Sequence, residues 1–135
     1  MNSPEYLDIL VIEDDPSIRE LVTLSLRDAG HRVIESSARH ALALPQTAPV
    51  SLIVVDCNTP KPASARTVIH RLRSRYPSAL VVAISGYFAA HATCDAELAS
   101  ALGADCTMGK PFRCEELVAL VQRLSRSAIQ ATPEN

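Results

Sequence analysis

The stretch SLIVVDCNTP at residues 51–60 decides the fold class of this chain. Its first half, residues 51–55, is a short apolar run with β-branched side chains, which is typical of a strand buried on both faces of a parallel sheet. Asp56 follows this run directly. A carboxylate in that place lies at the C-terminal end of the predicted strand, where open α/β sheets bind their ligands.

Similar apolar runs recur along the chain and alternate with helical patterns. The other predicted strands, two of them weaker, cover residues 7–12, 32–35, 79–84 and 105–108. The predicted helices cover residues 16–29, 38–44, 65–72, 91–102 and 113–126. Asp15 before Pro16 is a typical cap for the first helix, and Gly30 is typical of its end. Regular alternation of strand and helix predicts an α/β fold, with a parallel sheet covered by helices on both faces.

Length and composition indicate one ordinary globular domain. The chain has 135 residues, of which 47% are hydrophobic and 21% charged, and its net charge is −2. This charge provides no general attraction to nucleic acid, and no apolar run approaches the roughly 20 residues of a membrane span. The N-terminus has no signal-peptide pattern, so we expect a cytoplasmic protein. Residues 127–135 are polar and unpatterned, which predicts a disordered tail.

Cysteine and histidine spacings predict neither a metal site nor a disulfide framework. We therefore expect four reduced cysteines, Cys57, Cys94, Cys106 and Cys114. We expect the four histidines to be surface or boundary residues; they are His31, His40, His70 and His91.

Polar residues with compatible chemistry follow four of the predicted strands. They are Glu13-Asp14-Asp15, then Asp56, then Ser85-Gly86, and then Lys110-Pro111. Carboxylates gathered at one edge repel one another unless a cation neutralises them. Mg²⁺ suits one or two carboxylates with a carbonyl and waters, and a lysine and a hydroxyl can hold an anionic oxygen. Each residue taken singly is more often a cap or a solvated loop residue, but together they indicate a phosphoryl-transfer site with a carboxylate nucleophile.

These segments also resemble a known family. Over about residues 5–126, with 127–135 as a tail, the chain is similar to the receiver domain of response regulators. The matching segments are residues 9–19, 52–60, 83–86, 103–105 and 110–112. The resemblance implies a flavodoxin-like (βα)5 fold with a five-stranded parallel sheet in the order 2-1-3-4-5.

The resemblance also implies roles for individual residues. Asp56 corresponds to the phosphoacceptor, and Ser85 and Lys110 correspond to the residues that contact the phosphoryl group. Glu13, Asp14 and Asp56, together with the backbone carbonyl of Asn58, correspond to the Mg²⁺ or Mn²⁺ site, with Asp14 as a direct ligand. Asp15 falls one place beyond the acidic pair, which leaves it as a helix cap. The Lys110–Pro111 peptide corresponds to one that is often cis.

The implied function is that of a stand-alone, single-domain response regulator rather than an enzyme. A sensor histidine kinase or histidine phosphotransfer protein is the expected phosphodonor, and an unidentified target protein receives the signal. We expect no direct contact with nucleic acid or membrane. We expect Ser85 and Lys110 to move toward the phosphoryl group. This movement should change the surface formed by the fourth helix, fifth strand and fifth helix.

Three positions depart from the family pattern. Thr107 stands where the family usually has an aromatic residue that swings inward on activation. Residues 59–64 contain two prolines and lack the usual glycine, and residues 86–90 suggest an altered loop before the fourth helix. These departures concern the output of the switch more than its phosphorylation.

Three other functions remain as alternatives. An aspartyl-phosphate phosphatase or phosphotransferase would need a second acid two residues after its nucleophile, where this chain has Asn58. A flavin-binding protein would need a glycine- and hydroxyl-rich loop where this chain has Glu13-Asp14-Asp15. A degenerate receiver, acting as a phosphorylation-independent interaction module, would have lost Asp56, Lys110 or the acidic pair.

Overall fold

The computed structural model describes residues 6–45, 49–89 and 94–131, with side chains described up to residue 126. Five strands alternate with five helices in these ranges: β1 (Asp8–Ile12), α1 (Pro16–Asp28), β2 (Arg32–Ser36), α2 (Ala38–Ala41), β3 (Leu52–Asp56), α3 (Pro62–Arg75), β4 (Leu80–Ser85), α4 (Ala96–Leu102), β5 (Cys106–Gly109) and α5 (Cys114–Ala131). All strand pairs are parallel, and the order is β2-β1-β3-β4-β5. The predicted fold class and strand order are confirmed.

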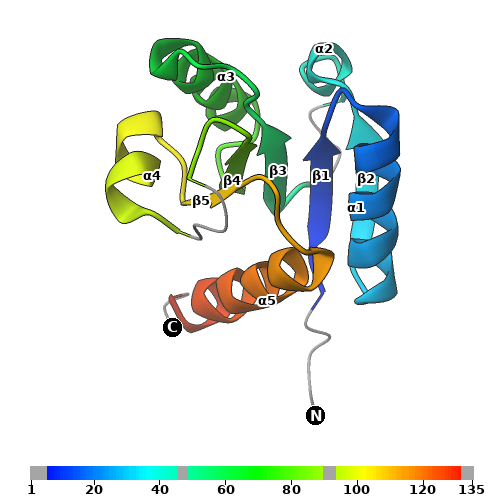
Figure 1. The fold of residues 1–135 in the computed structure, drawn as a ribbon. Coiled ribbons are helices and arrows are strands. Elements are labelled where there is room, and N and C mark those ends of the chain that lie inside the picture. Colours follow the sequence, from blue (N-terminus) through cyan, green and yellow to red (C-terminus); the bar gives the residue numbers. More distant parts are fainter. Residues whose placement is uncertain (1–5, 46–48, 90–93, 132–135) are drawn as a thin grey trace.

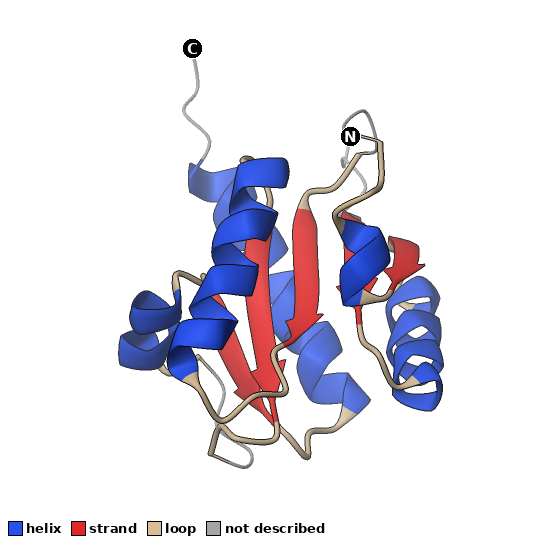
Figure 2. Cartoon of the chain, turned by 90° about the horizontal axis from the view of Figure 1, so that it is seen from above, coloured by secondary structure: helices blue, strands red, loops and turns tan. Residues whose placement is uncertain are grey.

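Two apolar cores lie on opposite faces of the sheet. Successive residues of a strand point to opposite faces, so Ile9 and Val11 pack with α1 and α5, whereas Leu10 and Ile12 pack with α2, α3 and α4. Figures 1 and 2 show the sheet between these two groups of helices. The unbroken apolar runs of β1, β3 and β4 are therefore explained by burial on both faces.

The helix ends differ in places from the sequence-based boundaries. The first helix begins at Pro16 as predicted, because the Asp15 carboxylate accepts the backbone N–H groups of Ser17 and Ile18, and it ends at Asp28, one residue early. The second ends at Ala41, three residues early. The fourth begins at Ala96 rather than near His91, after the capping residue Asp95.

The fifth helix continues to Ala131, so the predicted boundary at 126 falls inside it, and residues 132–135 lie outside the described part. Residues 127–132 contain neither glycine nor proline, so nothing in the backbone chemistry ends the helix at 126. Among the described residues, no helix is both long enough and apolar enough to cross a bilayer.

His31 is buried, with 4% of its surface exposed, so its expected surface or boundary position is wrong. Its Nδ1 accepts the backbone N–H of Leu7 at 3.0 Å, and its buried Nε2 has no partner among the described residues. Burial lowers the pKa of His31, because desolvation disfavours the charged ring. The side chain joins the turn after α1 to the residue that precedes β1.

Candidate functional site

The sheet register brings the predicted site residues to one edge. Ile12 of β1 pairs with Val55 of β3, so Glu13 and Asp56 follow neighbouring strands at the same level. Asp56 in turn pairs with Ile84, and Ser85 pairs with Gly109. The residues that follow β1, β3, β4 and β5 therefore lie along the C-terminal edge of the sheet, as the sequence predicts.

Lys110 joins the two central carboxylates of this edge. Its Nζ donates to Glu13 Oε1 at 3.0 Å and to Asp56 Oδ2 at 3.1 Å. Burial alone would lower the pKa of Lys110, but its hydrogen bonds and ion pairs with Glu13 and Asp56 outweigh burial and raise it. The lysine is therefore a fixed positive charge between two acidic side chains. The Lys110–Pro111 peptide is cis, as expected.

The Asp56 carboxylate has a raised pKa. Burial is the largest cause, and the neighbouring Glu13 adds to it, so the pKa of Asp56 rises to about 6 although Lys110 opposes the shift. Only 11% of its side-chain surface is exposed. Its Oδ1 is buried and has no hydrogen-bond partner among the described residues. One oxygen of Asp56 is thus held by Lys110 and the other is available to a new partner.

An open cavity of about 460 Å³ lies over Asp56. Its polar lining comes from the ends of β1, β3 and β5, namely Glu13, Asp14, Asp15, Asp56, Asn58, Thr59 and Lys110. Asp14 Oδ1 accepts the backbone N–H of Ala38 at 3.3 Å, which places this carboxylate beside the start of α2. The cavity therefore combines four carboxylates with one lysine.

The acidic side chains of this cavity offer the oxygen ligands that Mg²⁺ binds, and they offer enough of them that do not already contact other described residues. Asp56 Oδ1 accepts no hydrogen bond from any residue that the structure describes, and Asp14 and Asn58 line the same cavity. Glu13 is less available, because its Oε1 accepts from Lys110 and its Oε2 accepts the backbone N–H of Asp15 at 3.3 Å. Within the described ranges, no three acidic, histidine or cysteine side chains converge tightly enough to bind a metal by themselves. Mg²⁺ needs only one or two carboxylates when a carbonyl and waters complete its shell.

Ser85 lies at the same C-terminal edge of the sheet, but its hydroxyl oxygen contacts the backbone and not the acidic residues. The side chain is fully buried, and Oγ accepts the backbone N–H of Tyr87 at 3.0 Å. The Ser85 carbonyl accepts the backbone N–H groups of Lys110 and Phe88. Ser85 is not among the residues that line the acidic cavity. The structure thus brings Glu13, Asp14, Asp56, Asn58 and Lys110 together and leaves Ser85 beside them.

Thr107 fastens β5 to the start of α4. It is 2% exposed, and its Oγ1 accepts the backbone N–H of Asp95 at 3.2 Å. Its carbonyl accepts the backbone N–H of Cys94 at 2.7 Å. The residue that replaces the usual aromatic is thus an anchoring point for α4.

A disulfide bond joins Cys94 to Cys106, so the expectation of four reduced cysteines is wrong for these two. They are 12 residues apart in sequence, yet α4 turns the chain back and their Cα atoms are only 4.7 Å apart, within the range of a disulfide. The spacing alone contains no sign of this pairing. Cys57 and Cys114 are free.

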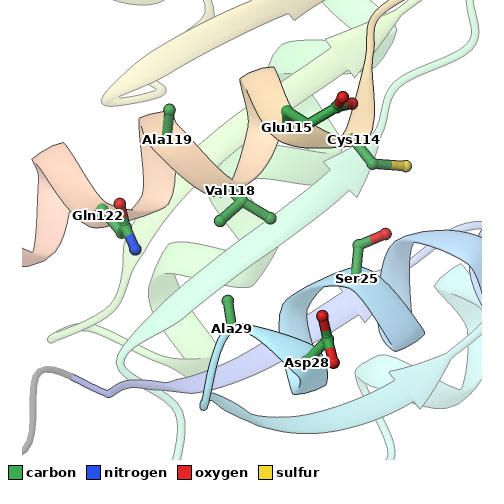
Figure 3. A pocket seen from close by; sticks show the side chains of 8 residues that line it. All are labelled: Ser25, Asp28, Ala29, Cys114, Glu115, Val118, Ala119 and Gln122. Atoms are coloured by element: carbon green, nitrogen blue, oxygen red, sulfur yellow. The ribbon is translucent and has the colours of Figure 1, made fainter.

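Two further depressions lie beside α1, on the face of the sheet that α1 and α5 cover. Figure 3 shows a groove of about 450 Å³ between α1 and α5, in which Val118 of α5 points toward α1, and Ser25 and Ala29 line the side formed by α1. It shares no residue with the acidic cavity. An apolar depression of about 390 Å³ lies nearer the site, lined by Ile18, Leu21, Val22, Lys110, Pro111, Phe112 and Cys114. Ile18 and Lys110 line both this depression and the acidic cavity.

Comparison with known proteins agrees with this geometry. The family model of the response regulator receiver domain matches residues 9–122, and the chain belongs to this family. Receiver domains are signalling domains of two-component systems; they interact with histidine kinases and typically bind Mg²⁺ at the phosphorylation site.

Individual relatives give the same result. A putative NtrX-like response regulator of Rickettsia felis is 30% identical over 120 residues, covering 87% of this chain and 24% of that protein. The chain thus spans about a quarter of this relative's length. The chemotaxis protein CheY4 of Vibrio cholerae is 29% identical with a TM-score of 0.67, covering 87% of this chain and 98% of that one. A Burkholderia pseudomallei response regulator, solved with a phosphorylated aspartic acid, calcium ion and citrate, is 25% identical with a TM-score of 0.67, covering 93% and 71%.

Proposed function

We propose that this chain is a response regulator that accepts a phosphoryl group on Asp56 from a phosphohistidine of a sensor kinase or phosphotransfer protein. The observation that carries this proposal is the arrangement around Asp56. Lys110 holds Oδ2 at 3.1 Å, Oδ1 has no hydrogen-bond partner in the described part of the chain, and an open acidic cavity lies over the carboxylate. We propose that the receiver unit begins at about residue 5 and includes the whole of α5, which continues past residue 126 to Ala131.

The transfer needs an ionised nucleophile and neutralised charge. An oxygen of Asp56 attacks phosphorus in line, the N–P bond of the phosphohistidine breaks, and its electron pair returns to the imidazole nitrogen. Because the pKa of Asp56 is about 6, the carboxylate is mostly ionised at neutral pH. Lys110 stabilises the negative charge on the transferring group from a position that it already occupies.

Mg²⁺, when bound, supplies the remaining charge neutralisation at the phosphoryl oxygens. Asp14, Asp56 and the carbonyl of Asn58 would hold it directly. Both oxygens of Glu13 are already hydrogen-bonded, so Glu13 would act on the metal's waters and on Lys110 rather than as a direct ligand.

The donor approaches over an apolar surface next to the site. Leu21 and Leu24 of α1 are each 56% exposed, and Leu21 lines the depression that shares Ile18 and Lys110 with the acidic cavity. Exposed apolar surface beside a polar site is typical of a protein-docking surface. We therefore infer that the phosphodonor protein packs against α1 while its phosphohistidine reaches Asp56.

The test is phosphate incorporation from acetyl phosphate with Mg²⁺. Wild-type protein should form an acid-labile phosphate adduct, and Asp56→Asn should form none. Asp28→Asn, which changes an exposed aspartate at the end of α1, is the matched control and should label like the wild type. Full labelling of Asp56→Asn would exclude Asp56 as the acceptor, and a wild-type chain that never labels would indicate the phosphorylation-independent module instead.

A further inference from the structure

The disulfide between Cys94 and Cys106 joins the residues that flank α4. Cys94 lies two residues before the helix, and Cys106 is the first residue of β5. The covalent loop therefore contains all of α4. Cys106 is fully buried, whereas Cys94 is exposed, so a solvent thiol can reach the bond from the Cys94 side.

Hydrogen bonds beside the disulfide make the same connection. The backbone N–H groups of Cys94 and Asp95 donate to the carbonyl and the hydroxyl of Thr107, at 2.7 and 3.2 Å. The Asp95 carboxylate in turn caps α4 by accepting the backbone N–H of Leu98 at 3.1 Å. Cys94 adopts a φ of +57°, in the left-handed region that residues other than glycine seldom occupy. We call these three links to β5 the α4 clasp: the disulfide and the two hydrogen bonds to Thr107.

The clasp is close to the site along the chain and in space. β5 runs from Cys106 through Thr107 to Gly109, and Lys110 follows with its contacts to Asp56 and Glu13. At Gly109 an added Cβ would lie 1.9 Å from the carbonyl oxygen of Ala89. Ala89 of the β4–α4 connection therefore lies directly against Gly109, the residue that precedes Lys110.

We propose that Cys94–Cys106 is a redox-sensitive bond that controls how far α4 responds to phosphorylation of Asp56. The oxidised chain holds the start of α4 on β5 by a covalent bond, and the reduced chain keeps the two hydrogen bonds to Thr107 without it. This inference rests on the proposed function, because it assumes that Asp56 is phosphorylated.

The chemistry is ordinary thiol–disulfide exchange. A thiolate attacks Sγ of the exposed Cys94, a mixed disulfide forms, and Cys106 leaves as a thiolate that takes up a proton. A second thiol resolves the mixed disulfide, so two electrons and two protons enter the protein. A small-molecule dithiol supplies them, and a small-molecule disulfide reverses the reaction. Cys57 does not compete, because its side chain is buried, with 6% of its surface exposed, and a solvent thiol or disulfide does not reach it.

The first measurement is a thiol count of the full chain under denaturing conditions. The oxidised protein should show two reactive thiols, from Cys57 and Cys114, and the protein treated with dithiothreitol should show four. Four thiols after treatment with oxidised glutathione would overturn the proposal, because the bond would not form in the folded chain.

The second measurement is amide hydrogen exchange in α4 with and without beryllofluoride and Mg²⁺. Beryllofluoride should change the exchange rates of α4 in both redox states, and the change should be at least about 5-fold larger in the reduced chain than in the oxidised chain. A factor of about 5 is the lower end of the usual coupling between two sites of a protein. Cys94→Ser should behave like the reduced chain under both conditions, and Cys114→Ser should keep the redox dependence. If Cys94→Ser fails to fold, reduction of the wild type makes the same comparison.

The outcomes separate this inference from the proposed function. Labelling of Asp56 by acetyl phosphate is measured on the same samples. Normal labelling with an equal response of α4 in both redox states would overturn the redox inference alone. Absence of labelling in both states would overturn the proposed function and this inference with it.

Discussion

Replacing Asp56 with asparagine should stabilise the metal-free protein at neutral pH while abolishing its phosphorylation. Asparagine has the shape of aspartate without its charge. Lys110 keeps its hydrogen bond to Glu13 at 3.0 Å in the variant, so the substitution does not leave a buried cation without a partner. The change therefore isolates the cost of keeping Asp56 ionised.

The magnitude follows from the pKa of Asp56. It rises from 3.8 to about 6, chiefly through burial and then through Glu13, against the opposing effect of Lys110. The folded state therefore binds this proton more tightly than the unfolded state. The resulting stability is fully present below about pH 4 and is lost as the pH rises through 6. At about 1.4 kcal/mol per pKa unit, ionised Asp56 costs the folded protein about 2 to 3 kcal/mol at pH 7.5.

Urea unfolding at pH 7.5 in EDTA measures this difference. Asp56→Asn should be more stable than the wild type by about 2 to 3 kcal/mol, and the two should converge near pH 4. Mg²⁺ should stabilise the wild type and have much less effect on the variant, because it binds the ionised carboxylate. Glu20→Gln, at an exposed position of α1, controls for the change in net charge. An Asp56→Asn variant less stable than wild type at pH 7.5 in EDTA would refute this reasoning.

Four further predictions concern other positions of the chain. Lys110→Ala should slow labelling by acetyl phosphate on the order of 100-fold and reduce the response of α4 to beryllofluoride; an unchanged labelling rate contradicts its role. Gly109→Ala should destabilise the chain by roughly 1–3 kcal/mol in urea, because the new Cβ would collide with the β4–α4 connection; an unchanged midpoint would show that this connection yields freely. Burial lowers the pKa of His31, so wild-type stability relative to His31→Gln should fall as the pH drops below about 6.5; parallel pH profiles would contradict a neutral buried ring. Leu21→Ala should weaken transfer from whichever phosphorylated sensor kinase labels the wild type but leave labelling by acetyl phosphate unchanged; equal loss with both donors argues against docking on α1.

The sheet and the acidic residues at its C-terminal edge could be predicted, because both depend on patterns within short stretches of the sequence. Apolar runs such as residues 52–55 identify strands by themselves, and a parallel sheet places the residues that follow its strands at one edge. This rule alone is enough to predict that Glu13, Asp56 and Lys110 lie close together. Their exact roles were inferred from resemblance and stay predictions.

Features that depend on how distant segments meet could not be predicted. Nothing in the separation of Cys94 and Cys106 shows that α4 brings their Cα atoms to 4.7 Å. The burial of His31 depends on the Leu7 N–H that it accepts from a segment 24 residues away. The start of α4 is different, because Asp95 before Ala96 is an ordinary capping signal that the alanine-rich pattern upstream obscured.

The hydrogen bonds of Ser85 indicate how phosphorylation of Asp56 could affect α4 although the chain lacks the usual aromatic switch residue. The Ser85 hydroxyl accepts the N–H of Tyr87, and its carbonyl accepts the N–H of Lys110. If the Ser85 side chain rotates so that Oγ moves toward a phosphoryl oxygen, the bond from the Tyr87 N–H to Oγ is broken. The β4–α4 connection lies against Gly109, next to Thr107 and the α4 clasp. We therefore expect the signal to involve the backbone hydrogen bonds at the two described ends of the β4–α4 connection, from Phe88 to Ser85 and from Cys94 to Thr107. The disulfide of Cys94 lies at the second of these ends, so its state should affect the response of α4 directly.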